Sequence, residues 1–345
     1  MIRPLPLAAA LLTPACSPEP ASQATPRPTP AATADRATPP VTADSHATPK
    51  PGTIRTFGDW TVGCDNGGRC AMLSLIPEDS ATGTETTIAL IRDPGAQDHY
   101  TLSRTASRAA GATVDGRAIP GDADALARAM ANGTTLAVAG TAGRISLKGA
   151  SAALRYIDAA QGRAGTTSAT VARGAATVVP PAPALPVVRA IALRPHAGTL
   201  DPRQLATMRR LGQCEDMSGL DAPTLAEAEP GTLIAALPCS AGAYNVIAAL
   251  FVIRGGTVTP AATDAPAGFE ATGADSQTPV HSLINPDLAD GVLTSFAKGR
   301  GLGDCGLDQS FAWDGTRLRL VEQSEMPECR GNTATITTWR ARVVR

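Results

Sequence analysis

The stretch SFAWDGTRLRLVEQ, residues 310–323, sets the fold class expected for this chain. Asp314-Gly315 readily adopts the positive φ angles of a tight hairpin turn, and alternating apolar residues stand on both sides of it. Two flanking segments, DGVLTSFAK at 290–298 and ATITTWRARVV at 334–344, have the composition of strands. The C-terminal part of the chain is therefore expected to form an antiparallel β-meander.

Similar strand patterns recur towards the N-terminus, with three helical segments between them. The expected strands are TLIAALPC, YNVIAALFVIRGG, IRTFGDWTVGC, RCAMLSLI, TETTIALIRD, TTLAVAG and GRISLKG. Helices are expected at 122–133, with Asp122 or Asp124 as the cap, at 150–161, and at 200–212, where Asp201-Pro202 is a strong start signal. The pattern predicts a mainly β (α+β) fold with a few short helices.

A proline-rich stretch, VVPPAPALP at 178–186, divides the body of the chain. Proline cannot continue a helix or a central strand, so this stretch is typical of a linker. We expect two β-rich domains, at 54–176 and 189–345, joined by a linker at 177–188. Their antiparallel meanders would be held by local disulfides.

The first fifteen residues have the layout of a secretory signal peptide: Arg3, then an apolar run too short to span a bilayer. Cys16 follows, and a cysteine at this boundary indicates lipidation, although Thr13 and Pro14 depart from the usual pattern. The alternative is ordinary cleavage nearby. Residues 16–53 are rich in Pro, Ala and Thr and predict a disordered, lipid-anchored tether. The expected location is the periplasm, at the outer membrane, with no transmembrane helix.

Six cysteines remain once Cys16 is set aside, and they form three successive pairs. An exported chain meets an oxidising compartment, where an even number of cysteines indicates disulfides. Fifteen connectivities are possible. The sequential one is favoured because each pair lies in one local stretch: Cys64–Cys70, Cys214–Cys239 and Cys305–Cys329. A structural zinc site would need closer cysteine pairs or neighbouring histidines.

The glycine loop, KGRGLGDCG at 298–306, contains G-x-G-x-x-G at Gly301, Gly303 and Gly306. A dinucleotide site also needs a helix directly after the glycines, whereas the next residues have the pattern of a strand. We interpret the loop as a structural turn and expect no nucleotide and no cofactor. The formal net charge of −1 gives no electrostatic reason to expect nucleic acid as a partner.

Other catalytic and metal-binding signals are weak. Ser295-Phe296-Ala297-Lys298 matches S-x-x-K, but glycines follow where the serine enzymes need a helix. The histidines at 99, 196 and 281 have no neighbouring carboxylate and nucleophile in the sequence, so we expect surface or loop positions. Asp304, Asp308 and Asp314 lack the ligand spacing of a calcium loop. The three tryptophans are expected to pack in the core: Trp60, Trp313 and Trp339.

Several motifs occur in an order that resembles a known family: FGDWTVGCDN, ISLKGASAALRYIDAAQGRAGT, PCSAGAYN, KGRGLGDCG, WDG and CRG. Together they resemble the bacterial exported family called domain of unknown function 1176, over nearly all of 55–345. The first half is also similar to the invasion-associated locus B family. The first resemblance implies location and architecture, and it implies no activity.

The sequence favours a non-enzymatic lipoprotein whose body binds an envelope protein or glycan, anchored to the membrane by its N-terminal lipid. The alternative is a periplasmic hydrolase whose site assembles only in space. A Cys305–Cys329 bridge would bring the glycine loop beside residues 328–332. The candidate binding surface is therefore the mixed-charge group Lys298, Arg300, Asp304 and Arg330, for which a solvated rim is the alternative interpretation.

Overall fold

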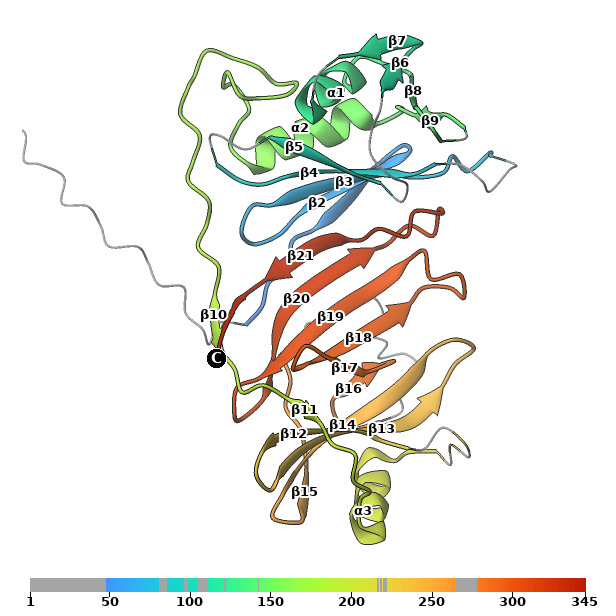
Figure 1. Cartoon of the computed structure of the whole chain (residues 1–345), viewed down its shortest axis with the longest axis vertical. Coiled ribbons are helices and arrows are strands. Elements are labelled where there is room, and N and C mark those ends of the chain that lie inside the picture. The colour runs from blue at the N-terminus through green and yellow to red at the C-terminus, as the bar shows by residue number, and fades with distance from the viewer. Residues whose placement is uncertain are drawn as a thin grey trace, which may run out of the picture. The chain divides into compact units, whose positions relative to one another are not determined.

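The computed structural model describes residues 48–80, 86–95, 99–104, 111–120, 122–141, 143–215, 217, 219, 222–264 and 278–345. The predicted signal peptide, Cys16 and most of the tether lie outside these residues. Within them the chain forms three helices and twenty-two strands in five sheets, which confirms the mainly β fold class (Figure 1). No helix of this described part is long and apolar enough to cross a membrane.

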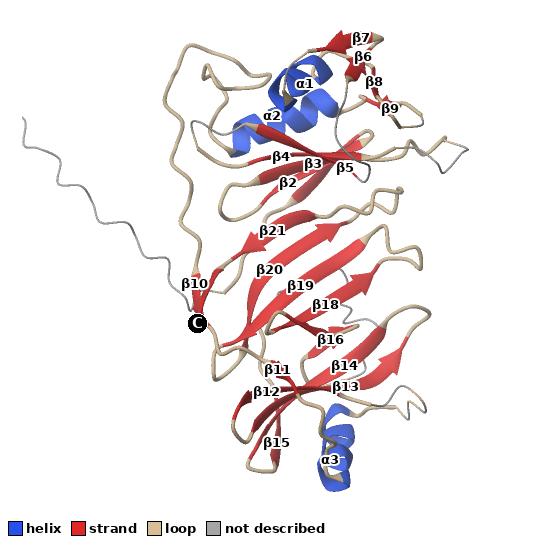
Figure 2. Cartoon of the chain, in the orientation of Figure 1, coloured by secondary structure: helices blue, strands red, loops and turns tan. Residues whose placement is uncertain are grey.

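The N-terminal sheet is antiparallel, and its five strands follow chain order: β1 (Ile54–Phe57), β2 (Trp60–Cys64), β3 (Cys70–Ser74), β4 (Ile88–Arg92) and β5 (Tyr100–Arg104). Successive side chains of a strand point to opposite faces. One face carries Trp60, Met72 and Leu90 into a core shared with α1 (Ala123–Met130) and α2 (Ala150–Ala160). Both helices lie over this face of the sheet (Figure 2).

The helices begin where the sequence predicts. The Asp122 carboxylate caps α1 by accepting a hydrogen bond from the Ala125 amide at 3.0 Å. Helix α2 starts after Gly149, whose φ is 96° and where a Cβ atom would lie 1.7 Å from the Phe57 carbonyl oxygen. A small sheet beside the helices has the order β7-β6-β8-β9, with β6 (Ala112–Val114), β7 (Arg117–Ile119), β8 (Thr135–Val138) and β9 (Ile145–Ser146).

The middle sheet opens the C-terminal half. It contains β11 (Arg194–Pro195), β12 (Thr224–Glu229), β13 (Thr232–Ala241), β14 (Val246–Arg254), β15 (Thr257–Pro260) and β16 (Ser282–Ile284), which pairs with β14. Helix α3 (Pro202–Gly212) starts with a capping box from Asp201 and Gln204. Its Met208 packs on one face of the sheet, in a core with Leu237 and Phe251.

The C-terminal sheet is the predicted meander: β17 (Asp287–Ala289), β18 (Val292–Lys298), β19 (Gly306–Trp313), β20 (Leu318–Met326) and β21 (Ile336–Arg340), in chain order. Asp314 closes the β19–β20 hairpin by accepting from the amides of Thr316 and Arg317, both at 2.8 Å. The inner face shares a core with the middle sheet, and all three tryptophans are buried as expected.

The two halves are joined by hydrogen bonds between segments distant in the sequence. The Gly52 amide donates to Thr338, and the Asn332 side chain donates to the Ser74 carbonyl at 2.7 Å. Near the C-terminus, β22 (Arg342–Val344) runs parallel to β10 (Val187–Arg189). Residues 41–345 cluster as one compact unit, and the division into domains at 177–188 stays a prediction.

The three disulfides have the predicted sequential pairing: Cys64–Cys70, Cys214–Cys239 and Cys305–Cys329. The first bridge closes the turn between β2 and β3. The second joins the segment after α3 to β13. The third joins the glycine loop to the segment between β20 and β21. Each bridge thus fixes a connection next to a sheet.

Candidate functional site

The pocket loop, residues 161–173, follows α2 and is held from within by Asp158. This carboxylate is fully buried, and it accepts hydrogen bonds from the amides of Thr170 and Val171 at 2.8 Å and of Ala172 at 3.1 Å. A buried charge is stable only when it is paired and hydrogen-bonded. These three amides therefore fix the end of the pocket loop to the last turns of α2.

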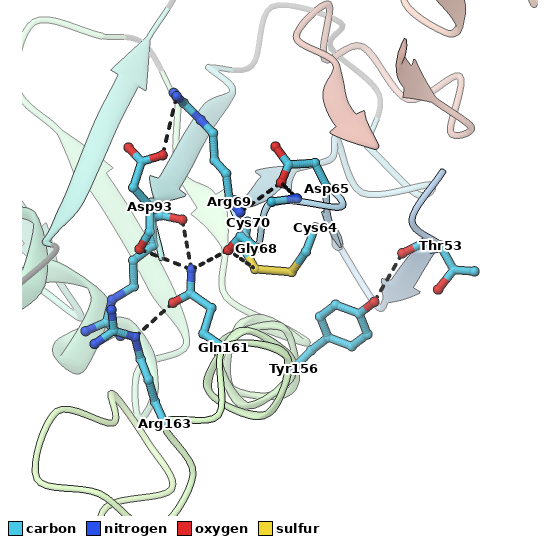
Figure 3. The surroundings of a disulfide bond; sticks show 12 residues. Thr53, Cys64, Asp65, Gly68, Arg69, Cys70, Asp93, Tyr156, Gln161 and Arg163 are labelled. Carbon is cyan, nitrogen blue, oxygen red and sulfur yellow. Dashed lines mark hydrogen bonds and ion pairs between the residues drawn. A yellow bond between two sulfur atoms is a disulfide. The ribbon is translucent and has the colours of Figure 1, made fainter. Parts of the chain in front are cut away.

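Gln161 and Arg163 hold the start of the same loop, as Figure 3 shows around the Cys64–Cys70 bridge. The Gln161 amide nitrogen lies 2.9 Å from the Gly68 carbonyl oxygen and 3.0 Å from that of Arg92. Its oxygen accepts from the Arg163 Nε at 2.9 Å. Arg163 is fully buried, which is rare for arginine. Its guanidinium donates to Gln161 and Ser168 of the loop and to the Gly95 carbonyl after β4.

Arg92, the last residue of β4, forms the base of a pocket against this loop. Its guanidinium donates to the Thr170 hydroxyl at 3.1 Å and to the Ser168 carbonyl at 3.0 Å, and it lies 3.7 Å from Asp158. It also stacks over the Tyr100 ring at 4.8 Å. The buried Arg92 charge is thus compensated and rigidly placed.

The arginine pocket is a cavity of about 220 Å³ over this base. Three arginines and one carboxylate line it, together with a histidine; because Asp158 compensates Arg92, the excess of positive charge comes from Arg128 and Arg173. Arg128, in the last turn of α1, is exposed and makes no ion pair with another described residue. The lining residues are Arg92, His99, Tyr100, Asp124, Arg128, Thr167, Ser168, Ala169, Thr170 and Arg173.

A histidine–aspartate pair stands at the rim of the arginine pocket. The His99 Nδ1 contacts the Asp124 carboxylate, whose other oxygen accepts from the Tyr100 amide at 2.7 Å. Burial raises the pKa of Asp124, but these hydrogen bonds outweigh it and hold the pKa below its ordinary value. An ionised Asp124 fixes the Nδ1–H tautomer of His99 and leaves Nε2 free. The sequence did not reveal this pair, because 25 positions separate its members.

The arrangement suits the binding of an oxyanion. Arg173 donates one hydrogen bond to the Thr167 carbonyl at 2.8 Å, which orients its guanidinium, and Arg128 stands opposite on a helix. Guanidinium groups offer parallel N–H donors that match the oxygens of a carboxylate or phosphate. Because the loop and the base are fixed before any ligand arrives, binding requires little ordering of the protein.

The residues that the sequence placed on a binding surface lie elsewhere, around the Cys305–Cys329 bridge. The Arg300 Nε donates to Asp304 at 2.6 Å, and Asp304 also accepts from the Gly331 amide at 2.7 Å. The hydrogen bond from Arg300 lowers the pKa of Asp304, against the effect of burial. Lys298 is held through its backbone, which makes two hydrogen bonds with the Asn245 side chain.

Arg330 points away from this group and towards the N-terminal half. It donates to the Ile76 carbonyl at 2.8 Å, to the Gly58 carbonyl at 3.0 Å and to Asp59 at 2.5 Å. The structure therefore brings Arg300 and Asp304 together beside Gly331, whereas the Arg330 side chain bonds residues of the N-terminal half. A binding role for these residues stays a prediction.

The glycine loop has the structure of a turn. Gly303 has a φ of 68°, and a Cβ at Gly306 would lie 2.2 Å from the Ala297 carbonyl oxygen. Strand β19 starts at Gly306, as the residues after the loop predicted. The glycines thus permit a close approach of β18 and β19 at the bridge.

Comparison with known proteins identifies a family, but neither the family nor the matched relative has an assigned activity. The model of the family described as "Protein of unknown function (DUF1176)" matches residues 54–344. The chain is 28% identical over 348 residues to the "Uncharacterized protein YpfG" of Escherichia coli (strain K12), a match that covers 84% of this chain and 93% of that protein. No solved structure matches significantly. These matches do not show the similarity to the invasion-associated locus B family.

Proposed function

Because the chain belongs to the DUF1176 family of proteins of unknown function, we propose its role from its own geometry. It is a non-enzymatic binding module of the cell envelope that holds an anionic group of a glycan in the arginine pocket. The observation that carries this proposal is the convergence of Arg128 and Arg173, beside the compensated Arg92, on one cavity that contains a single carboxylate.

The chemistry of the pocket loop supports a glycan ligand. Thr167, Ser168 and Thr170 line the cavity beside the arginines, and the hydroxyls of Ser168 and Thr170 already bond Arg163 and Arg92. Hydroxyls both donate and accept hydrogen bonds, as sugar hydroxyls do, whereas the guanidinium groups only donate. A ligand that carries one phosphate or carboxylate on a sugar ring matches this combination.

Binding to phosphorylated and carboxylated sugars tests the proposal directly. We expect glucose 1-phosphate or glucuronate to bind saturably in calorimetry, and the double variant Arg128→Gln/Arg173→Gln to weaken that binding at least tenfold. Arg210→Gln, on the exposed side of α3, is the matched control and should change nothing. Absence of saturable binding of both sugars, or an equal effect of the control, would overturn the proposal.

The envelope location forms part of the same proposal. Three disulfides among the six cysteines of the body fit an oxidising compartment. An exported chain that is lipidated at Cys16 and extended by its Pro-rich tether would hold the pocket away from the outer membrane. Metabolic labelling with a fatty-acid probe should mark the wild type and not Cys16→Ala; equal labelling of the two would contradict the anchor.

A hydrolase is the second candidate, and the His99–Asp124 pair favours it. This pair combines a histidine with a supporting carboxylate, as a general base does, and Ser168 lines the same cavity. Hydrolysis of p-nitrophenyl esters or glycosides that is lost in His99→Gln would establish this candidate. If the wild type binds the sugars but hydrolyses none of these substrates, the result would support the binding module and contradict the hydrolase.

A further inference from the structure

A second cavity, of about 310 Å³, lies where β3 and β4 meet β20 and β21. We call it the cross-sheet cavity. Ile91 lines it, whereas the next residue of β4, Arg92, forms the base of the arginine pocket. Successive side chains of a strand point to opposite faces, so the N-terminal sheet separates the two cavities. Any ligand of the cross-sheet cavity is therefore independent of the function proposed above.

Two arginines form the basic wall of the cross-sheet cavity. Arg340 contacts the fully buried carboxylate of Asp65, and its amide and carbonyl both bond the Asn66 side chain, at 2.8 and 2.9 Å. Arg69 lies 3.5 Å from Asp93, and its side chain is 39% exposed. The Cys64–Cys70 bridge closes the turn that carries Asp65 and Arg69, as Figure 3 shows. Both guanidinium groups are thus placed, and Arg69 keeps donors towards solvent.

Glu322 supplies the opposite charge. It lies directly across from Arg340 in the pairing of β20 and β21, yet it is exposed and makes no ion pair with any residue that the structure describes. Its charge also acts on the neighbouring strand, because burial and Glu322 together raise the pKa of Asp308 to about 6. A carboxylate without a counter-charge at the edge of a cavity is a position for a cation of a ligand.

The floor between these charges is apolar. Ala71 and Ile91 are paired across β3 and β4, and both line the cavity. Thr335 and Thr337 complete the lining on the β21 side, where the Thr337 hydroxyl accepts from Ser324 at 3.0 Å. A ligand that fits must carry both charges and a short apolar segment.

We propose that the cross-sheet cavity binds a short zwitterionic peptide, whose carboxylate pairs with Arg69 and Arg340 and whose ammonium pairs with Glu322. The two guanidinium groups offer parallel N–H donors to the carboxylate oxygens. The side chain of a small residue rests on Ala71 and Ile91. The peptide backbone can exchange hydrogen bonds with Thr337.

Three versions of one dipeptide test this proposal: L-alanyl-L-alanine, its N-acetyl form, which lacks the ammonium, and its amide, which lacks the carboxylate. Calorimetry on the full chain should show saturable binding of the free dipeptide and at least tenfold weaker binding of each blocked form. Equal binding of all three, or no saturable binding of the free dipeptide, would overturn the proposal.

Variants then assign the contacts. Glu322→Gln should weaken binding of the free dipeptide at least tenfold and leave the affinity for the N-acetyl form unchanged, because that form has no ammonium. Arg69→Gln should weaken binding of the free dipeptide at least tenfold and leave the affinity for the amide unchanged, because the amide has no carboxylate. Glu229→Gln, an exposed carboxylate of the middle sheet, is the matched control. Arg128→Gln should leave dipeptide binding intact, so a failure of the arginine pocket does not affect this result. An effect of Glu229→Gln as large as that of Glu322→Gln would contradict the assignment.

Discussion

The pocket loop and the glycine loop have similar sequences, but the aspartate beside each loop has a different kind of partner. Both combine glycines, an arginine and a nearby aspartate: QGRAGT after Asp158, and KGRGLGDCG with Asp304. In the pocket loop, the buried Asp158 holds backbone amides, so that Arg173 of the loop faces the same cavity as Arg92 and Arg128 of other segments. In the glycine loop, Asp304 pairs with Arg300 of the same loop. The comparison teaches that an arginine is available to a ligand to the extent that the protein leaves some of its donors unused.

The largest expected effect is that of Asp158→Asn, which would break the pocket loop. Arg92 would keep its charge, with a side chain only 6% exposed, and lose its counter-charge. Loss of one partner of a buried pair costs about 3–5 kcal/mol in the free energy of unfolding. Urea unfolding measures this loss. Asp122→Asn, at the exposed cap of α1, should be near wild type because Asn is an equally good cap.

The next largest expected losses of stability follow from removing the Cys305–Cys329 bridge or the Cys64–Cys70 bridge. A cross-link that closes a longer loop removes more entropy from the unfolded chain, and the sequence separations are 24 for Cys305–Cys329 and 6 for Cys64–Cys70. Double Cys→Ser variants should therefore lose about 3.5 kcal/mol at the glycine loop and about 2.4 kcal/mol at the other bridge. Denaturant midpoints test this order, and a larger loss at Cys64–Cys70 would contradict the loop-entropy account.

Two arginines near the glycine loop sharpen the comparison further. Arg330→Gln removes three hydrogen bonds to the N-terminal half, one of them to a carboxylate, and should cost about 2–3 kcal/mol. Arg300→Gln should cost less than Arg330→Gln, because the Arg300 side chain is 42% exposed, but the loss should be measurable because its partner Asp304 is only 5% exposed. Equal losses for the two variants would show that Arg330 does not join the halves.

The smallest effect concerns Asp308, two residues beyond the glycine loop. Its folded pKa is raised to about 6 from 3.8, so between these values the folded state binds more protons than the unfolded state. The free energy of unfolding therefore falls as pH rises through this window. Asp308→Asn should remove that fall and stabilise the protein by about 1 kcal/mol at pH 7, a figure reduced for the half-exposed position. Unfolding at pH 4 and pH 7 provides the test; an unchanged pH dependence would be the contrary result.

The sequence predicted those features that depend on local patterns. Asp122 and Asp201 mark the helix starts, Asp314-Gly315 marks the hairpin, and the cysteines pair with their nearest partners. Each signal acts over a few residues, or over about 25 in the case of two bridges. The chain therefore encodes its fold class in short segments that can be interpreted one at a time.

The candidate site could not be predicted in this way. Arg92, Asp124 and Ser168 come from three segments, and only the packing of α1 and the pocket loop on β4 and β5 brings them together. Arg330 resembled a surface residue because its partner Asp59 is 271 positions away. Long-range contacts of this kind leave no periodicity in the sequence.

The hydrogen bonds that link the ends of the folded chain have a consequence for the order of its formation. Asn66 and Arg340 are 274 positions apart, and Gly52 bonds to Thr338. Synthesis proceeds from the N-terminus, so β2 and β3 exist long before the C-terminal residues that bond the ends of these strands and the turn between them. Contacts so distant in sequence close slowly, since the loop between them must be ordered first. A chain truncated before residue 330 would leave Asp59, Asp65 and Ser74 without their partners Arg330, Arg340 and Asn332, and it would uncover the core that Ile336 shares with Leu73.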